Sequence, residues 1–184
     1  CLHQVDGCQL LGLGQDWKYE RQGLVSLKRI VEALRGLQLP AKDLLSFQRW
    51  VMFNYLIGNS DAHAKNISVL IDETGYTLAP FYDLLCVQVY GDDRLALYIG
   101  DEDQYASIGA HSWEAFCEDC GFSVKSTMTL FRKMAQDVAK AWATVTAQAT
   151  VDFALSRPEL GLIQSITMVI ETNCSAALSM TTKR

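Results

Sequence analysis

The stretch GNSDAHAKN, residues 58–66, holds several polar side chains directly after the most apolar part of the chain. Residues 42–57 (KDLLSFQRWVMFNYLI) are apolar nearly all round, which predicts a helix in the middle of a domain. Gly58 is suited to end that helix, and Asn59 and Ser60 are expected to continue as a loop. The sequence therefore predicts a polar loop held rigidly at its start by a buried helix.

A β-hairpin is predicted directly after this loop. Residues 67–71 are rich in β-branched side chains and predict a strand, residues 72–75 (DETG) a turn, and residues 76–81 the return strand. Pro80 indicates an edge or a strand end there, because proline cannot donate to a sheet ladder. Since the two open ends of a hairpin are neighbours, we expect Asp83 to return beside Asn66.

Asp61, Asn66 and Asp83 would then converge on one edge of the domain, with the oxygen groups that phosphoryl transfer requires. Asp61 and Asn66 are five positions apart, and Asp83 follows 17 residues after Asn66. Protein kinases place their catalytic Asp and metal-binding Asn five positions apart, with a further metal-binding Asp downstream. One Asn and one Asp suffice for Mg²⁺, which completes its shell with water and phosphate oxygens.

The remainder of the chain predicts a mainly α fold with a small β-hairpin. Helices are expected over residues 24–37, 112–120 (with Ser112 as N-cap and Gly121 as C-cap), 125–145 and 158–180, and a short extended segment over residues 95–99. No low-complexity linker or repeat interrupts the sequence. We therefore predict one domain spanning residues 1–184.

Composition restricts the partners and the compartment. Of 184 residues 49% are hydrophobic, and the net charge is −5 without a basic run, which argues against direct binding of nucleic acid or of an anionic membrane. No apolar run is long enough to span a bilayer. Six cysteines in a chain that needs no disulfides to fold indicate a reducing, cytoplasmic compartment.

Several spaced motifs, in the same order, resemble the C-terminal lobe of the HipA family of bacterial serine/threonine-protein kinase toxins. The likeness extends over about residues 3–145. It lies in the Asp-x-His-x-Lys-Asn loop, the hairpin after it, and residues 3–6 (HQVD), 18–20 (KYE), 79–85 (APFYDLL), 95–100 (LALYIG) and 111–116 (HSWEAF).

The resemblance implies roles for the polar loop. Asp61 would be the catalytic base, and Asn66 and Asp83 would bind Mg²⁺ and with it ATP. His63 and Lys65 are both candidates for ordering the loop or approaching the γ-phosphate, and the sequence does not separate them. Asp83 is followed by Leu84-Leu85, where eukaryotic kinases have Phe-Gly.

The family also implies partners. Its members phosphorylate a serine or threonine on a cytosolic protein, in known cases an aminoacyl-tRNA synthetase, and so arrest growth. An antitoxin of the HipB type binds DNA, so contact with DNA would be indirect. These are expectations from the resemblance alone.

The nucleotide-binding half of such a kinase is not found in this sequence. The chain starts at Cys1, and HQVD reads as mid-protein sequence; there is neither a Gly-x-x-x-x-Gly-Lys-Ser/Thr loop nor a Val-Ala-Ile-Lys-like strand. We therefore expect an N-terminal lobe outside this chain, as a further partner. Alone, the 184 residues should bind ATP weakly and transfer phosphate negligibly.

Other readings remain open. A small-molecule phosphotransferase of the aminoglycoside or choline kinase type has a similar loop, and a non-catalytic remnant would bind only an antitoxin or the other lobe.

Asp83 could instead cap a helix starting at Leu84. Cys117 and Cys120 are interpreted as thiols on a helix rather than as zinc ligands, because no second ligand pair is present. The acidic residues 92–93 and 101–103 are interpreted as solvated loops.

Overall fold

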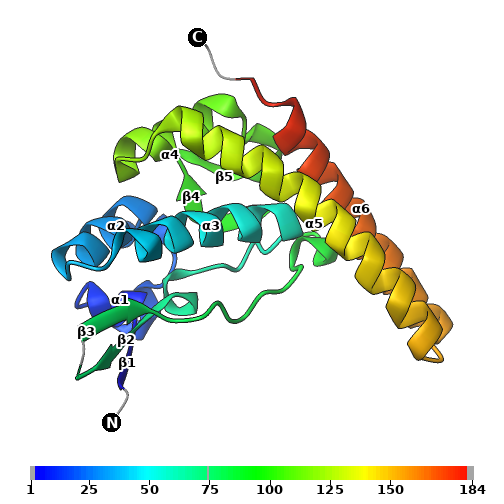
Figure 1. Cartoon of the computed structure of the whole chain (residues 1–184), viewed down its shortest axis with the longest axis horizontal. Coiled ribbons are helices and arrows are strands. Elements are labelled where there is room, and N and C mark those ends of the chain that lie inside the picture. The colour runs from blue at the N-terminus through cyan, green and yellow to red at the C-terminus, as the bar shows by residue number, and fades with distance from the viewer. Residues whose placement is uncertain (1–2, 74, 182–184) are drawn as a thin grey trace.

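Helix α3 (Ala41–Ile57) runs through the middle of the fold (Figure 1). The computed structural model describes residues 3–73 and 75–181. The other α-helices are α1 (Gly7–Leu10), α2 (Leu27–Gly36), α4 (Ala110–Cys120), α5 (Val124–Asp152) and α6 (Arg157–Ser179). The strands are β1 (His3–Asp6), β2 (Ser68–Asp72), β3 (Gly75–Leu78), β4 (Arg94–Ile99) and β5 (Glu102–Gln104), and the 3₁₀ turns are η1 (Gln15–Trp17), η2 (Glu20–Gln22), η3 (Ala64–Asn66), η4 (Gln88–Tyr90) and η5 (Tyr105–Ser107). On one side of α3 lie α4, β4 and β5, and on the other lie α1 and the sheet of β1, β2 and β3 (Figure 1). The predicted mainly α fold with little sheet is confirmed.

Helix α3 ends where the sequence predicts. Gly58 adopts a left-handed conformation with φ of 74°, and its backbone N–H donates to the carbonyls of Asn54 and Tyr55. The N–H of Asn59 donates to the carbonyl of Asn54 over 2.9 Å, which closes the end of the helix. The chain therefore leaves α3 in a fixed direction, into the polar loop.

The predicted hairpin is the larger part of a three-stranded antiparallel sheet. Strand β2 is central and pairs with β1 on one side and with β3 on the other. The sequence did not predict β1, because its four residues carry no alternation that distinguishes them from loop. Strand β3 ends at Leu78, three residues before the predicted end, and Pro80 lies just beyond this edge strand.

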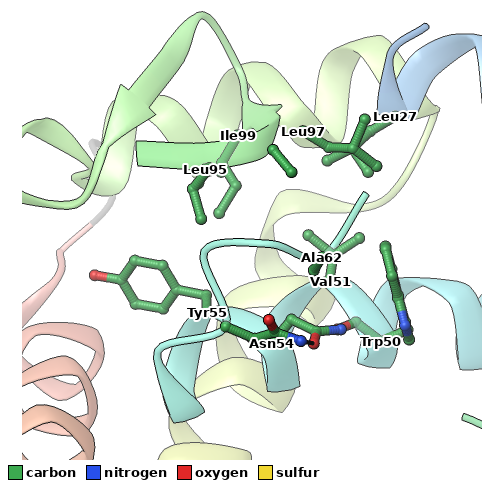
Figure 2. A pocket seen from close by; sticks show the side chains of 11 residues that line it. Leu27, Trp50, Val51, Asn54, Tyr55, Ala62, Leu95, Leu97 and Ile99 are labelled. Atoms are coloured by element: carbon green, nitrogen blue, oxygen red, sulfur yellow. Dashed lines mark hydrogen bonds between the residues drawn. The ribbon is translucent and has the colours of Figure 1, made fainter. Parts of the chain in front are cut away.

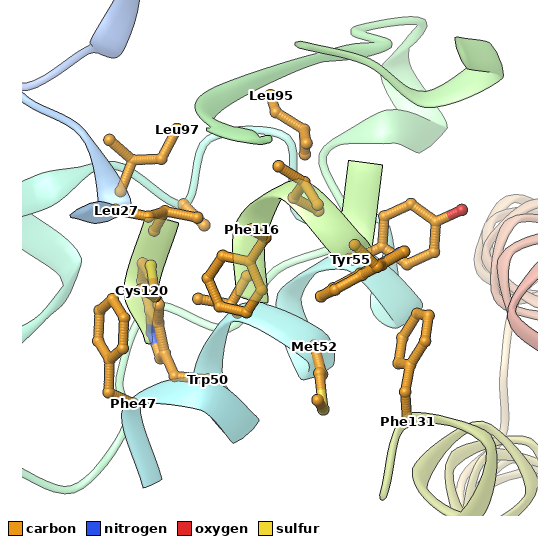
Figure 3. Packing of buried hydrophobic residues seen from close by; sticks show 14 of the residues in the cluster. Leu27, Phe47, Trp50, Met52, Tyr55, Leu95, Leu97, Phe116, Cys120 and Phe131 are labelled. Atoms are coloured by element: carbon orange, nitrogen blue, oxygen red, sulfur yellow. The ribbon is translucent and has the colours of Figure 1, made fainter. Parts of the chain in front are cut away.

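Aromatic side chains form the centre of the hydrophobic core (Figure 3). The ring of Tyr55 from α3 lies edge-on to Trp113 of α4 at 5.7 Å and to Phe131 of α5 at 5.8 Å. Trp113 and Phe116 are fully buried, whereas Trp142 is half-buried and donates to Thr167 of α6 over 2.8 Å. These contacts fix α3 in the fold and with it the start of the polar loop.

Three helix boundaries differ from the predictions by more than one residue. Helix α2 begins at Leu27, three residues after the predicted start, because Ser26 is its N-cap and its side chain accepts from the Arg29 N–H. Helix α4 begins at Ala110 with Gly109 as its N-cap, so Ser112 lies inside the first turn and accepts from the Gly109 N–H over 3.2 Å. Helix α5 extends to Asp152, seven residues beyond the predicted end, because α6 packs antiparallel against it (Figure 1). Gly121 ends α4 with φ of 63°, as predicted.

Five of the six cysteines lie in the part of the chain that the structure describes. Cys8, Cys86, Cys117, Cys120 and Cys174 are free thiols, and Cys1 lies outside the described residues. Within residues 3–73 and 75–181 no group of three His, Cys, Asp or Glu side chains is arranged to hold a metal ion. In the same part of the chain, no helix combines the length and apolar character needed to cross a membrane.

Candidate active site

The polar loop, residues 58–66, and the residue directly after it make backbone hydrogen bonds with three other parts of the chain. The carbonyl of Ser60 accepts from Ala96 of β4 over 2.8 Å, and the N–H of Ala64 donates to the carbonyl of Lys18 over 3.1 Å. Directly after the loop, the carbonyl of Ile67 accepts from the N–H of Gly7 over 2.9 Å. Turn η3 closes the loop and delivers the chain into β2. The loop is thus a rigid connection, although it contains no long regular element.

Beneath the loop the structure has apolar support with no room for a ligand (Figure 2). Leu95 and Leu97 of β4 face Val51 of α3 and Ala62 of the loop around a cavity of about 20 Å³. Such a volume holds about one water molecule. This side of the loop is therefore packed against α3 and β4.

The hairpin brings Asp83 back to Asn66, as the sequence predicts. The side-chain Nδ2 of Asn66 donates to Oδ2 of Asp83, and Nδ2 of Asn59 donates to the Asp83 carbonyl over 2.9 Å. Asn59 also donates to Oδ1 of Asn54 over 2.7 Å, so the end of α3 and Asp83 are directly linked. Asp83 does not cap a helix, because residues 79–87 form neither helix nor strand.

Asp83 has an unusual backbone for a residue with a side chain. Its φ is 56°, in the left-handed region that aspartate tolerates but that few non-glycine residues adopt. Such conformations persist where surrounding contacts enforce them and are concentrated at functional sites. Here the contacts from Asn59 and Asn66 enforce it, and the exposed carboxylate is left facing outward beside Asn66.

The amide oxygen of Asn66 is an unsatisfied hydrogen-bond acceptor within the described part of the chain. The side chain is 3% exposed, and Oδ1 has no hydrogen-bond partner among the described residues. A buried oxygen of this kind is costly to leave unsatisfied. Oδ1 of Asn66 and the Asp83 carboxylate supply hard oxygen donors on one edge, which is the donor set that Mg²⁺ prefers. The pair therefore fits a divalent cation.

Asp61 lies in the same loop, and its carboxylate has a partner that the sequence did not assign. The hydroxyl of Tyr19 donates to Oδ1 of Asp61 over 3.0 Å. The two residues are 42 positions apart, so no local spacing could indicate the contact. Tyr19 does fall in the KYE motif of residues 18–20, which is the signal that could have drawn attention to it.

His63 is buried under the tyrosine and is electrostatically linked to both carboxylates. Its ring meets that of Tyr19 edge-on at 5.6 Å, and Nδ1 has no partner among the described residues. Burial and the charge of Lys18 lower the pKa of His63, against the opposing influence of Asp61 and Asp83. The imidazole is therefore neutral at pH 7. Lys65, which is half-buried, is the better source of positive charge.

All five predicted site residues thus lie on the polar loop or on the segment that returns to it. Asn66 and Asp83 are in direct contact, whereas Asp61 lies five positions before Asn66 in the same loop and accepts its hydrogen bond from Tyr19. Tyr19 and Asn59 were missed: Tyr19 fixes the Asp61 carboxylate, and Asn59 fixes the backbone of Asp83.

Comparison with known proteins shows which family the chain is similar to. The family model of the HipA-like C-terminal domain matches residues 1–142. The putative kinase Y4mE of Sinorhizobium fredii is 35% identical over 147 residues, which cover 78% of this chain and 35% of the relative. The serine/threonine-protein kinase toxin HipA of Shewanella oneidensis is 32% identical over 157 residues, covering 78% of this chain and 36% of the toxin.

A solved structure extends the likeness to the fold. The complex of HipA, HipB and operator DNA from Shewanella oneidensis MR-1 contains a chain that matches with a TM-score of 0.86 and 28% identity. The match covers 94% of the present chain and 43% of that chain. The 184 residues therefore span well under half the length of the proteins they resemble.

Proposed function

This chain belongs to the HipA-like C-terminal domain family, and from that premise we propose that it supplies the catalytic loop of a serine/threonine-protein kinase of the toxin type. The phosphate donor would be ATP with Mg²⁺, and the acceptor a hydroxyl on a cytosolic protein. The observation that carries the proposal is the contact between Asn66 and Asp83, with Oδ1 of Asn66 buried and free.

Each polar residue has a distinct part in the proposed reaction. Asp61 would accept the proton of the attacking hydroxyl, and Asn66 and Asp83 would bind the cation through oxygen. When bound, Mg²⁺ would neutralise charge on the β- and γ-phosphates. Lys65 would add positive charge near the γ-phosphate, and neutral His63 would support the loop through its contact with Tyr19.

The proposed partners follow from the family and from the charge of the chain. A further, N-terminal lobe would bind the adenine and the α- and β-phosphates, because the 184 residues contain no glycine-rich phosphate loop. An antitoxin of the HipB type would bind the kinase and carry it to DNA. With a net charge of −5 and no basic run, this lobe is not suited to bind DNA itself.

Phosphate transfer from labelled ATP to protein tests the proposal in the protein that joins this chain to its nucleotide-binding lobe. Asp61→Asn should lower the rate by about 10²–10⁴-fold, the usual contribution of a general base. Asp83→Ala should lower both the rate and the affinity for Mg²⁺. Asp101→Ala removes an exposed carboxylate from an acidic loop and should leave the rate unchanged.

The outcomes separate the three readings. Unchanged transfer in Asp61→Asn and Asp83→Ala would overturn the assignment of the site. Transfer to an aminoglycoside or choline but not to protein would support a small-molecule phosphotransferase. Binding of the antitoxin without any transfer by the wild-type protein would support a non-catalytic module.

A further inference from the structure

The segment of residues 18–21 is attached to the site at three points. The carbonyl of Lys18 accepts from Ala64, the hydroxyl of Tyr19 donates to Asp61, and Oε2 of Glu20 accepts from the Tyr98 N–H over 2.6 Å. The first two contacts are to the polar loop and the third is to β4, which also binds that loop through Ala96. The segment is therefore anchored on both sides of Tyr19.

The ring of Tyr19 is fixed as well. His63 meets it edge-on at 5.6 Å, and the side chains of Lys18 and Arg21 lie over it at 4.8 Å and 4.2 Å from the ring centre. In the backbone, the Tyr19 N–H donates to Oε1 of Gln22 over 3.1 Å. Because the ring and the backbone of Tyr19 are both held, the position of its hydroxyl oxygen is fixed.

The Tyr19 hydroxyl is important because few other contacts within the described residues orient the Asp61 carboxylate. Among the side chains in the described part of the chain, Tyr19 supplies the hydrogen bond that reaches the Asp61 carboxylate. The residue is half-buried, and its carboxylate makes no ion pair within residues 3–73 and 75–181. A general base must meet the proton it removes within hydrogen-bond reach, and a misplacement of about 1 Å can cost about 10²-fold in rate.

We infer that Tyr19 is a positioning residue, which binds Oδ1 of Asp61 so that Oδ2 is presented to the acceptor hydroxyl; the inference rests on the proposed kinase function. During transfer the acceptor oxygen bonds to the γ-phosphorus and the bond from phosphorus to the β,γ-bridging oxygen breaks, releasing ADP. The proton of the acceptor passes to Oδ2. Tyr19 keeps its own proton throughout.

In a second possible arrangement, the same hydrogen bond from Tyr19 to Asp61 would inhibit the reaction. If the acceptor hydroxyl needed Oδ1, Tyr19 would occupy its place and would have to leave before each turnover. Removing the hydroxyl would then raise the rate or lower the KM for the protein substrate. The two arrangements therefore predict opposite effects of one substitution.

Tyr19→Phe in the protein that includes the nucleotide-binding lobe distinguishes them. Phenylalanine keeps the ring, its contact with His63 and its two stacked cations, and removes only the hydroxyl. We expect kcat to fall by about tenfold to a hundredfold with the KM values for ATP and protein unchanged. Incorporation of 3,5-difluorotyrosine at position 19, which restores a donor, should bring kcat back to within a few-fold of wild type. Tyr76→Phe, at an exposed tyrosine of β3, is the matched control and should leave kcat unchanged.

A readout without activity tests the inference even if the proposed function fails. In the 184-residue chain, three-bond couplings report the χ1 angle of Asp61 by NMR. We expect one χ1 rotamer in wild type and an average over rotamers in Tyr19→Phe. An unchanged rotamer, or a kcat in Tyr19→Phe at or above that of wild type, would overturn the inference. Absence of phosphate transfer by the wild-type protein, with the rotamer change observed, would refute the proposed function and leave the contact intact.

Discussion

Gly58→Ala tests how strictly the geometry of the loop depends on the end of α3. Gly58 has φ of 74°, and a Cβ built on it would lie 2.5 Å from Cγ1 of Val169 in α6 and 3.1 Å from Oε1 of Gln88. Gln88 cannot move freely, because it accepts from Asn173 over 3.0 Å and donates to Asp93 over 2.9 Å. The substitution should therefore displace either α6 or the loop.

The expected loss of stability has two parts. A left-handed conformation costs a residue with a Cβ about 1–2 kcal/mol, partly offset by about 0.4–1 kcal/mol from the lower entropy of the unfolded chain. Overpacking against Val169 and Gln88 adds about 1–3 kcal/mol. We expect a total loss of about 2–4 kcal/mol in the free energy of unfolding for Gly58→Ala.

Gly91→Ala is the matched control for the first part. Gly91 has φ of 86°, but a Cβ there would meet nothing within 4 Å. Its substitution should cost about 1 kcal/mol or less, from backbone strain alone. Urea denaturation of the 184-residue chain measures both values. A loss for Gly58→Ala no larger than that for Gly91→Ala would refute the claim that close packing against α6 fixes this corner.

Two further predictions concern buried polar groups. Burial raises the pKa of Glu20 from 4.5 to about 7, so its stabilising contribution is complete below pH 4.5 and is lost as pH rises through about 7. At about 1.4 kcal/mol per pKa unit, the free energy of unfolding of the wild type should fall by about 3 kcal/mol over that pH range relative to Glu20→Gln. Urea denaturation of both proteins at several pH values measures this difference. Parallel curves of unfolding free energy against pH would contradict the prediction. Thr127→Val removes the buried acceptor of Gln48, at 2.6 Å, and should cost about 1–3 kcal/mol. Thr129→Val, at an exposed position of the same helix, should change stability by less than about 0.5 kcal/mol, and equal losses would refute the role of the buried bond.

The sequence predicted the elements that follow from strong local patterns. Residues 42–57 are apolar nearly all round and Gly58 follows, so α3 and its end could be placed almost to the residue. Asp72 and Gly75 bound a tight turn, so the return of Asp83 to Asn66 could be anticipated from hairpin geometry alone. Local pattern and spacing were sufficient for these features.

What the sequence did not predict depends on contacts between distant segments. Strand β1 exists because Val5 pairs with Val69, and its four residues have no strand signal of their own. Tyr19 reaches Asp61 because residues 18–21 are anchored to β4 and to the loop, which only the folded chain brings together. The lower pKa of His63 likewise arises from tertiary burial. Long-range packing, which has no local pattern, decided these features.

Binding of Mn²⁺ in place of Mg²⁺ to the 184-residue chain, followed by NMR line broadening, tests most directly whether Asn66 and Asp83 share one cation. The side-chain amide of Asn66 and the backbone amide of Asp83 should broaden first as Mn²⁺ is added, and Asp83→Ala should abolish that effect. Broadening that begins in the acidic loop of residues 101–103 and leaves Asn66 unaffected would contradict the proposed site.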